Sequence, residues 1–324
     1  MQAMANESHL SAARKKKKHS KPEIKVDRTG ELDKNGPQSV ADFERLLLGQ
    51  PNSAELWVRY MVFQRELNEI EKSRQIARRA LSSIFPREER EKLDVWTALL
   101  HLENDFSSDE TVEDVFKEAC QYNDAREMHD RLIKIYVLSG KLDKADKLYQ
   151  SMMKNKSFNP DPALWLSYAT FLMSTLAPPS LTRARALLQR ATQSVPMNLH
   201  RYLTTKFGAM EFKSPNGDAE RGRTIFEGLI SAWPKKYDLW DIYVELERAH
   251  GMKENARQLY KRMAKAKMNR RRAMVVFKRW LEFEEAEGNA KEMKRVKALR
   301  QEWEERKDGP KEESQLAARS LSTI

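Results

Sequence analysis

The chain has 324 residues, of which 40% are hydrophobic and 33% are charged, and its formal net charge is +11. The hydrophobic fraction is somewhat below that of an average globular domain and the charged fraction somewhat above it. The single cysteine, Cys120, excludes an internal disulfide framework. No stretch approaches 18 uninterrupted apolar residues, so the sequence predicts no membrane-spanning helix.

Residues 1–39 are predicted to form a basic, disordered leader. They contain almost no aromatic residues, and such a segment cannot bury enough apolar surface to offset the entropy lost on ordering. The leader contains the run Arg14, Lys15, Lys16, Lys17 and Lys18. This run is a candidate nuclear or nucleolar targeting signal or a contact for phosphates. The alternative is a solvated tail with no partner.

The folded part is predicted to begin with a short helix over residues 43–48, capped by Ser39, that covers the first hairpin. Apolar residues then recur at helical spacing, and six segments are predicted to be the first helices of successive hairpins. These segments are 56–67, 94–104, 163–175, 201–213, 238–249 and 273–287. Their anchor residues are at positions 57, 96, 165, 204, 240 and 277. The longest gap contains a seventh, degenerate unit near His129 to Tyr136.

Each predicted first helix is followed by a second helix with a recurring core, such as GRTIFEGLI (222–230) or ARQLYKRMA (256–264). Between two hairpins, Pro234 ends one helix and Asp238 is predicted to cap the next. The pattern predicts an all-α solenoid of about seven stacked antiparallel hairpins, in the manner of tetratricopeptide superhelices, over residues 40–306. Residues 307–324, which include Gly309 and Pro310, are predicted to be a frayed polar tail.

The anchors and the glutamates that follow them are predicted to be structural. Trp57, Trp96, Trp165 and Trp240 are expected to be buried between neighbouring helices. A glutamate follows four of the six anchors after seven residues: Glu103, Glu211, Glu247 and Glu284. Because an active site does not recur in successive hairpins, these carboxylates are predicted to pair with basic residues of the second helices. The candidate partners are Arg223, Arg257 and Arg295.

Positive charge is concentrated near the end of the predicted array. Residues 41–252 have a net charge of −1, whereas residues 253–300 hold sixteen Lys and Arg against six Asp and Glu, a net charge of +10. Such a patch attracts a phosphate backbone or an acidic protein, and the alternative is a solvated surface without a partner. The candidate RNA- or partner-binding residues are Lys265, Lys267, Arg270, Arg271, Arg272, Lys278 and Arg279. The three consecutive arginines are predicted to lie in a loop.

No arrangement of residues indicates catalysis, a metal site or a cofactor. The six histidines are scattered, and none pairs with Cys or His at the spacing of metal ligands. The sequence contains neither a glycine-rich phosphate loop nor a nucleophile elbow. We therefore expect a non-enzymatic protein without a small-molecule substrate.

The pattern Trp-x-x-Tyr-x-x-x-Glu at Trp240, Tyr243 and Glu247, followed by Ala-Arg-x-Leu-Tyr at 256–260, resembles the half-a-tetratricopeptide (HAT) repeat. Longer segments, among them 42–81, 87–104 and 218–245, resemble the C-terminal module of the ribosomal RNA-processing protein 5 family, also called programmed cell death protein 11. In that family, S1-type RNA-binding domains precede this module. Because 39 residues leave no room for such a domain, the chain is expected to be a fragment or short form.

The resemblance implies a scaffold for pre-ribosomal RNA processing and small-subunit ribosome biogenesis, in the nucleus and nucleolus. The implied partners are other ribosome-biogenesis proteins and pre-rRNA or a small nucleolar RNA particle. One alternative is a HAT scaffold of messenger RNA splicing or 3′-end processing, which shares the fold. Another is a helical-repeat subunit of an enzyme such as a prenyltransferase, although no metal or pyrophosphate site is present in the sequence. A nonspecific RNA-binding module is a third alternative.

Overall fold

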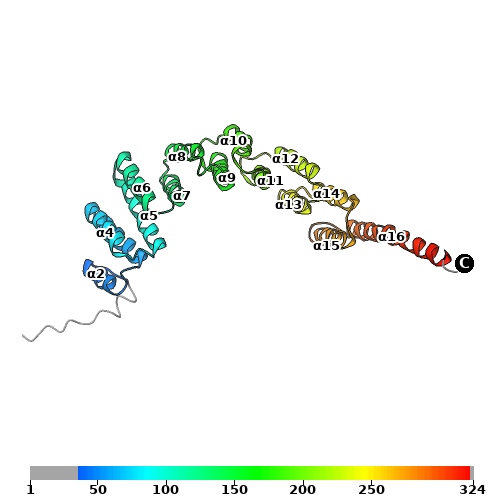
Figure 1. Cartoon of the computed structure of the whole chain (residues 1–324), viewed down its shortest axis with the longest axis horizontal. Helices are drawn as coiled ribbons and strands as arrows, with labels where there is room; N and C mark the ends of the chain where they lie inside the picture. Colours follow the sequence, from blue (N-terminus) through cyan, green and yellow to red (C-terminus); the bar gives the residue numbers. More distant parts are fainter. Residues whose placement is uncertain (1–35, 322–324) are drawn as a thin grey trace, which may run out of the picture. The chain divides into compact units, whose positions relative to one another are not determined.

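A computed structural model describes the backbone of residues 36–321 and the side chains of residues 36–306. Every regular element in this range is a helix, and none is a strand, so the predicted all-α class is confirmed (Figure 1). The chain forms two compact units, one ending at Val112 and the other beginning at Glu113, within helix α6 (Asp109–Tyr122). The continuity of the array across this division stays a prediction.

The first unit contains α2 (Val40–Gly49), α3 (Ala54–Glu66), α4 (Ile70–Ser83) and α5 (Glu89–Phe106). Helix α2 starts at a capping box, in which the Ser39 hydroxyl accepts from the Asp42 amide and the Asp42 carboxylate accepts from the Ser39 amide. Phe43 then stacks on Tyr60 of α3, with ring centroids 4.9 Å apart. The predicted capping helix therefore exists and covers the first hairpin, α3–α4.

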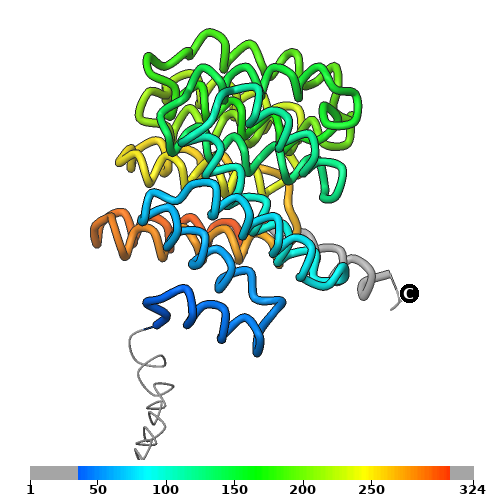
Figure 2. Tube along the Cα trace, turned by 90° about the vertical axis from the view of Figure 1, so that its left-hand side faces the viewer, coloured from blue at the N-terminus to red at the C-terminus, as the bar shows by residue number. Residues whose placement is uncertain are grey.

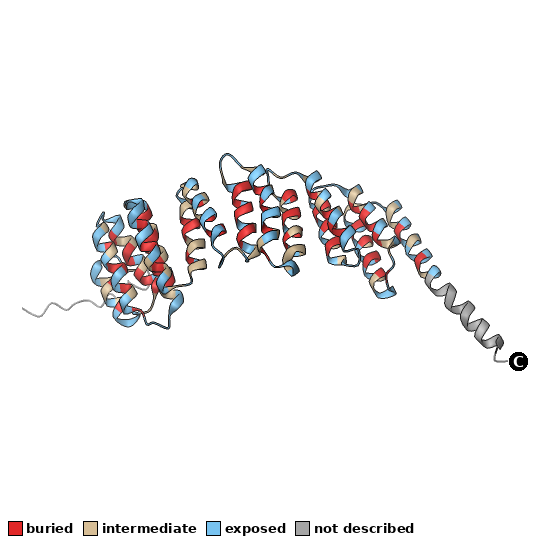
Figure 3. Ribbon diagram, turned by 45° about the horizontal axis from the view of Figure 1, so that its top comes forward, coloured by how far each residue is buried: buried red, intermediate tan, exposed pale blue. Residues whose placement is uncertain are grey.

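The second unit continues with five hairpins, in which each helix turns back along its predecessor (Figure 2). Their helices are α7 (Ala125–Leu138) with α8 (Leu142–Lys154), α9 (Pro162–Thr170) and the π-helical turn η1 (Phe171–Thr175) with α10 (Leu181–Ser194), α11 (Met197–Lys213) with α12 (Ala219–Ala232), α13 (Tyr237–Ala249) with α14 (Lys253–Lys265), and α15 (Arg270–Glu287) with α16 (Ala290–Leu321). Together with α3–α4, these are six of the about seven hairpins expected. The division between the two units falls within α6, so the pairing of α5 with α6 as the remaining hairpin stays a prediction. Buried residues lie along the faces where the helices of a unit meet (Figure 3).

The anchor tryptophans recur in the same environment. Trp57, Trp96, Trp165 and Trp240 are all buried. Three of their indoles donate a hydrogen bond to the carbonyl six residues earlier, in the preceding turn: Trp57 to Pro51 at 2.8 Å, Trp165 to Asn159 at 2.8 Å and Trp240 to Pro234 at 3.3 Å. Because a buried indole N–H needs an acceptor, this bond fixes the angle at which the chain enters each first helix.

An arginine of the second helix covers the same rings. The guanidinium carbons of Arg79, Arg190 and Arg262 lie 4.9, 5.9 and 5.3 Å from the ring centroids of Trp57, Trp165 and Trp240. In the degenerate hairpin α7–α8, His129 stands in place of the tryptophan. It lies between the rings of Phe116 and Phe158, at centroid distances of 4.8 and 5.1 Å. An aromatic contact is therefore kept even where the tryptophan is lost.

Two local predictions were wrong. Helix α13 begins at Tyr237 with Lys236 as its N-cap, so Asp238 lies in the first turn and does not cap. There its carboxylate still faces the partial positive charge of the helix N-terminus. Helix α16 continues to Leu321, beyond the predicted end at Arg306. The residues after Pro310 are mainly strong helix formers, which the prediction weighed too little against Gly309 and Pro310.

Trp240→Ala is expected to lower the free energy of unfolding by about 3–5 kcal/mol, because it leaves a large cavity among buried residues of α12, α13 and α14. Trp233→Ala is the matched control. Trp233 is 40% exposed at the end of α12, so its removal should have a much smaller effect. Urea unfolding of the full chain, followed by circular dichroism, measures both. Equal losses for the two variants would contradict the role assigned to Trp240.

Candidate functional site

A buried arginine–glutamate pair recurs four times between consecutive hairpins. The arginine comes from the second helix of one hairpin, and its Nε and Nη2 donate to the two carboxylate oxygens of a glutamate on the first helix of the next. The two distances are 2.9 and 3.0 Å for Arg74–Glu103, 2.8 and 3.0 Å for Arg185–Glu211, 2.7 and 2.9 Å for Arg223–Glu247, and 2.9 and 3.0 Å for Arg257–Glu284. We call these contacts the four clamps.

The clamp glutamates are almost inaccessible to solvent. Glu103, Glu211, Glu247 and Glu284 are 2, 5, 0 and 1% exposed. Three of them accept a further hydrogen bond. The backbone amide of Asp218 donates to Glu211 at 3.0 Å, the Asn255 side chain to Glu247 at 3.0 Å, and the Trp280 indole to Glu284 at 3.2 Å. A buried carboxylate that is fully hydrogen-bonded to a fixed arginine is structural, because it has no free proton-accepting position.

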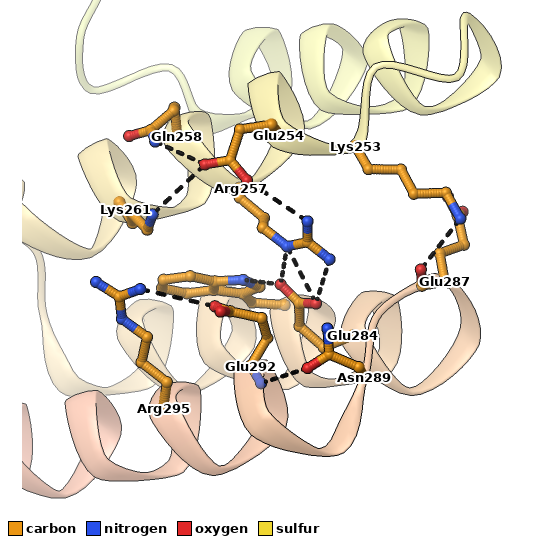
Figure 4. Close-up of polar contacts among 11 residues, drawn as sticks. Lys253, Glu254, Arg257, Gln258, Lys261, Glu284, Glu287, Asn289, Glu292 and Arg295 are labelled. Atoms are coloured by element: carbon orange, nitrogen blue, oxygen red, sulfur yellow. Dashed lines mark hydrogen bonds and ion pairs between the residues drawn. The ribbon is translucent and has the colours of Figure 1, made fainter.

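Figure 4 shows the clamp between α14 and α15, where Arg257 lies between Glu284 and the exposed Glu254. The hydrogen bond to Glu284 raises the pKa of Arg257 above its ordinary value, and Glu254 adds to this effect. The hydrogen bonds to Glu103, Glu211 and Glu247 likewise raise the pKa of the arginines Arg74, Arg185 and Arg223. All four arginines therefore stay charged over any physiological range of pH.

The predicted ion pairs of Arg223 and Arg257 are present, whereas that of Arg295 was wrong. Among the side chains that the structure describes, Arg295 forms an ion pair only with Glu292 of its own helix, at 3.8 Å. In α14, the clamp residue Arg257 lies three residues before the buried Tyr260. In α16, the residue three before the buried Val296 is Met293, so Arg295 does not occupy the clamp position. The sequence analysis also missed Arg74 and Arg185. Their signal was the arginine at the second position of the cores SRQIARRAL (73–81) and ARALLQRAT (184–192).

A second polar contact links three consecutive helices at two places in the chain. The Tyr60 hydroxyl donates to Glu44 at 3.0 Å, and Arg79 binds both oxygens of the same carboxylate at 2.9 Å. Tyr168 and Arg183 contact Asp146 in the same way, at 2.7 and 2.8 Å. Burial, followed by the hydrogen bond to Asp146, raises the pKa of Tyr168 to about 12, so this phenol stays a donor.

The titratable groups outside these contacts offer little reactivity. Burial raises the pKa of the Cys120 thiol to about 11, which suppresses the nucleophilic thiolate. Burial also lowers the pKa values of His101 and His129. Among the described residues, no group of three or more His, Cys, Asp and Glu is arranged to hold a metal ion. No helix in the described part of the chain is long and apolar enough to cross a membrane.

The basic residues near the end of the array are at the surface. Lys265, Lys267, Arg270, Arg271, Lys278 and Arg279 are exposed, and Arg272 is partly buried. The prediction that the three consecutive arginines lie in a loop was wrong. They form the first turn of α15, where the Asn269 side chain caps the helix by accepting from the Arg272 amide at 2.9 Å. Asn269 is a favoured N-cap, and this signal was overlooked.

The structure separates the seven basic candidates into different environments. Arg279 forms an ion pair with Asp241 of α13, and Lys278 lies 3.8 Å from Glu282. In contrast, Lys267, Arg271 and Arg272 line a cavity of about 590 Å³ together with Met268, Asn269 and Val275. Lys235, from the turn between α12 and α13, and Tyr237, the first residue of α13, complete its wall. We call it the basic cavity.

Lys235 and Tyr237 were not among the predicted site residues. They precede Lys267 by about one hairpin. Their signal was that the turns 233–236 and 266–269 occupy equivalent positions between hairpins, with Lys235 in the first turn and Tyr237 directly after it. Arg272 connects the two segments, because its guanidinium carbon lies 4.6 Å from the centroid of the Tyr237 ring. This distance is that of a cation–π contact.

Comparison with known families identifies the class of repeat. Residues 111–321 match the family model described as Suppressor of forked protein (Suf). The chain therefore belongs to the Suf family of HAT-repeat proteins, and the resemblance to HAT repeats is confirmed.

The relatives narrow this class further. The chain is similar to rRNA biogenesis protein rrp5 of Schizosaccharomyces pombe, with 42% identity over 261 residues that cover 81% of this chain and 15% of the relative. It is 38% identical over 277 residues to Protein RRP5 homolog of Mus musculus, covering 86% of this chain and 14% of that one. It is also 33% identical over 268 residues to rRNA biogenesis protein RRP5 of Arabidopsis thaliana, and the match covers 82% of this chain and 14% of that protein. The chain thus spans about a seventh of the length of these relatives.

Arg223→Met is expected to lower the free energy of unfolding by about 3–5 kcal/mol, because it leaves the Glu247 carboxylate buried without its counter-ion. Glu220→Ala is the control. It removes the exposed partner of the same arginine, at 2.7 Å, and should change the free energy by less than about 1 kcal/mol. The double variant Arg223→Met/Glu247→Leu should recover most of the loss, since an apolar pair replaces both charges. Urea unfolding measures all three, and equal effects of Arg223→Met and Glu220→Ala would exclude a structural clamp.

Proposed function

We propose that this chain is a non-catalytic scaffold in pre-ribosomal RNA processing and small-subunit ribosome biogenesis. The similarity to proteins named for rRNA biogenesis, over 81–86% of the chain, is the observation that carries the proposal. It acts in the nucleus and nucleolus, and its partners are other ribosome-biogenesis proteins together with pre-rRNA or a small nucleolar RNA particle. Because the matched segments make up only 14–15% of these relatives, their complete activity is not assigned to this chain.

The side chains support a scaffold more than an enzyme. The recurring carboxylates are held by arginines within the clamps, and the thiol of Cys120 is protonated at neutral pH. Helical-repeat arrays bind partners through extended surfaces formed by successive units. The near-neutral hairpins before residue 253 are assigned to protein partners, and the basic residues of 265–279 to RNA phosphates.

The test is affinity purification of the tagged full chain from cells, with and without RNase, followed by identification of the bound proteins and RNAs. We expect ribosome-biogenesis proteins in both samples and pre-rRNA or small nucleolar RNA only without RNase. The variant Arg270→Glu/Arg271→Glu/Arg272→Glu should keep the proteins and lose RNA. Recovery of splicing or 3′-end-processing components, without ribosome-biogenesis proteins, would refute the assignment.

The basic run Arg14–Lys18 lies outside the described residues and remains a proposed nuclear or nucleolar targeting signal. Replacing all five residues by alanine should shift a fluorescent fusion toward the cytoplasm, because import receptors recognise dense basic segments. The control replaces Lys307, Lys311 and Arg319 by alanine, which also removes positive charge near a terminus. Thermal stability should be unchanged in both variants. An unchanged distribution of the first variant would show that targeting does not depend on this run.

A further inference from the structure

We propose that the basic cavity binds one nucleotide of a single-stranded RNA. This inference rests on the RNA contact within the proposed function and assigns that contact to a defined site. The cavity has a volume of about 590 Å³ and lies between two turns, 233–236 and 266–269, that belong to neighbouring hairpins. The cavity is open to solvent, so one nucleotide of a longer strand can enter it.

Uncompensated positive charge makes the cavity suitable for a phosphate. Lys235, Lys267 and Arg271 are exposed, and none of them is ion-paired within the described part of the chain. Every charged residue among those lining the cavity is basic. The 18-residue helix α15 begins at its edge and adds the partial positive charge of its N-terminus. Lys235 comes from one turn, Lys267 from the other and Arg271 from the first turn of α15, and all three line the same cavity.

A planar surface makes the cavity suitable for a base as well. The Arg272 guanidinium lies over the Tyr237 ring at 4.6 Å, so packing against the ring holds its plane in place. Val275, which is 38% exposed, and the buried Met268 add apolar surface. Unpaired RNA bases stack on arginine planes and on aromatic rings, and neither surface depends strongly on base identity. An acidic peptide could bind the basic side chains, but it has no base to stack on the Arg272 guanidinium, so RNA fits the cavity better.

The neighbouring cations show why the site is confined. Arg279 and Lys278 lie near carboxylates of Asp241 and Glu282. Of the seven basic residues singled out by the sequence, only Lys267, Arg271 and Arg272 line the cavity. The structure therefore predicts unequal effects from substitutions that change the net charge by the same amount.

The experiment measures binding of the full chain to a 12-nucleotide oligouridylate by fluorescence anisotropy over a series of salt concentrations. The test variant is Lys235→Ala/Lys267→Ala/Arg271→Ala, and the matched control is Lys291→Ala/Lys294→Ala/Lys297→Ala, which removes three exposed cations from α16. The test variant should bind at least about tenfold more weakly, and its slope of log affinity against log salt should be shallower by about 2, since each contact to a single strand contributes about 0.7. The control should lose much less affinity. Circular dichroism checks that both variants fold.

Base stacking is tested separately with Tyr237→Leu and Arg272→Ala. Both should weaken binding of oligouridylate by roughly five- to a hundredfold, which is the range for loss of one stacked base. Neither should affect an abasic ribose-phosphate oligomer of the same length to that extent. Polyglutamate serves as the acidic-peptide probe, and it should bind far more weakly than oligouridylate.

Four results would overturn the cavity assignment: no RNA binding by the wild type, equal losses in the test and control triples, equal losses with the abasic oligomer, or stronger binding of polyglutamate. Affinity purification with the cavity triple separates this assignment from the proposed function. If any of these results is found but the wild type still retains ribosome-biogenesis proteins, the scaffold proposal is kept and the cavity assignment is rejected. RNA binding that depends on the cavity, without those proteins, would refute the scaffold alone.

Discussion

The spacing between consecutive hairpins depends on the buried arginine–glutamate clamp. At three adjacent junctions, from α10–α11 to α14–α15, a short turn joins two helices at one end, and a clamp joins them at the opposite end. Arg223 is near the start of α12 and Glu247 near the end of α13, so the pair of helices is closed at both ends. Burying two charges is unfavourable unless the geometry satisfies both, and a bidentate pair tolerates little sliding. The clamp therefore fixes the register between hairpins, and the apolar core supplies most of the favourable free energy.

The junctions without a clamp support this view, because both partners are missing together. At the α8–α9 junction, the arginine position is Asp146 and the glutamate position is Leu172. Asp146 instead pairs with Arg183, and Leu172 is fully buried. At α6–α7 the corresponding residues are Glu113 and Tyr136. Gln64, in the first hairpin, is neutral and buried, and the helix before it is the short capping helix α2. No junction in the described chain retains one clamp charge without the other, as the penalty for an unpaired buried charge requires.

The repeats, the positions of the first helices and two of the clamps could be predicted from the sequence, because they depend on spacing within one or two helices. The π-helical turn at Phe171–Thr175 even falls inside the predicted helix 163–175. The incorrect predictions concern residues whose role depends on competing local signals or on packing. Arg295 follows the same local pattern as Arg257, Glu-x-x-Arg, but the buried side of α16 is rotated relative to it, and only packing reveals this difference. The basic cavity could not be predicted either. Its two walls are about 30 residues apart, and periodicity gives no information about which turn side chains meet.

Ion pairing between helices distinguishes the basic residues in the body of the array from those at its basic end. The net charge of −1 over residues 41–252 conceals thirty basic and thirty-one acidic residues. Many of the basic ones are used between helices, as in Arg79 with Glu44 and Arg185 with Glu211. When the carboxylate partner of an arginine lies on a neighbouring helix, the pair is nearly neutral, and it attracts a distant phosphate only weakly. At the α12–α13 and α14–α15 turns, the clamps lie at the far ends of the helices, so they fix the walls of the cavity without neutralising its cations. The same residue type therefore serves as a structural element at one end of a helix pair and, in the proposed site, as a ligand-binding element at the other.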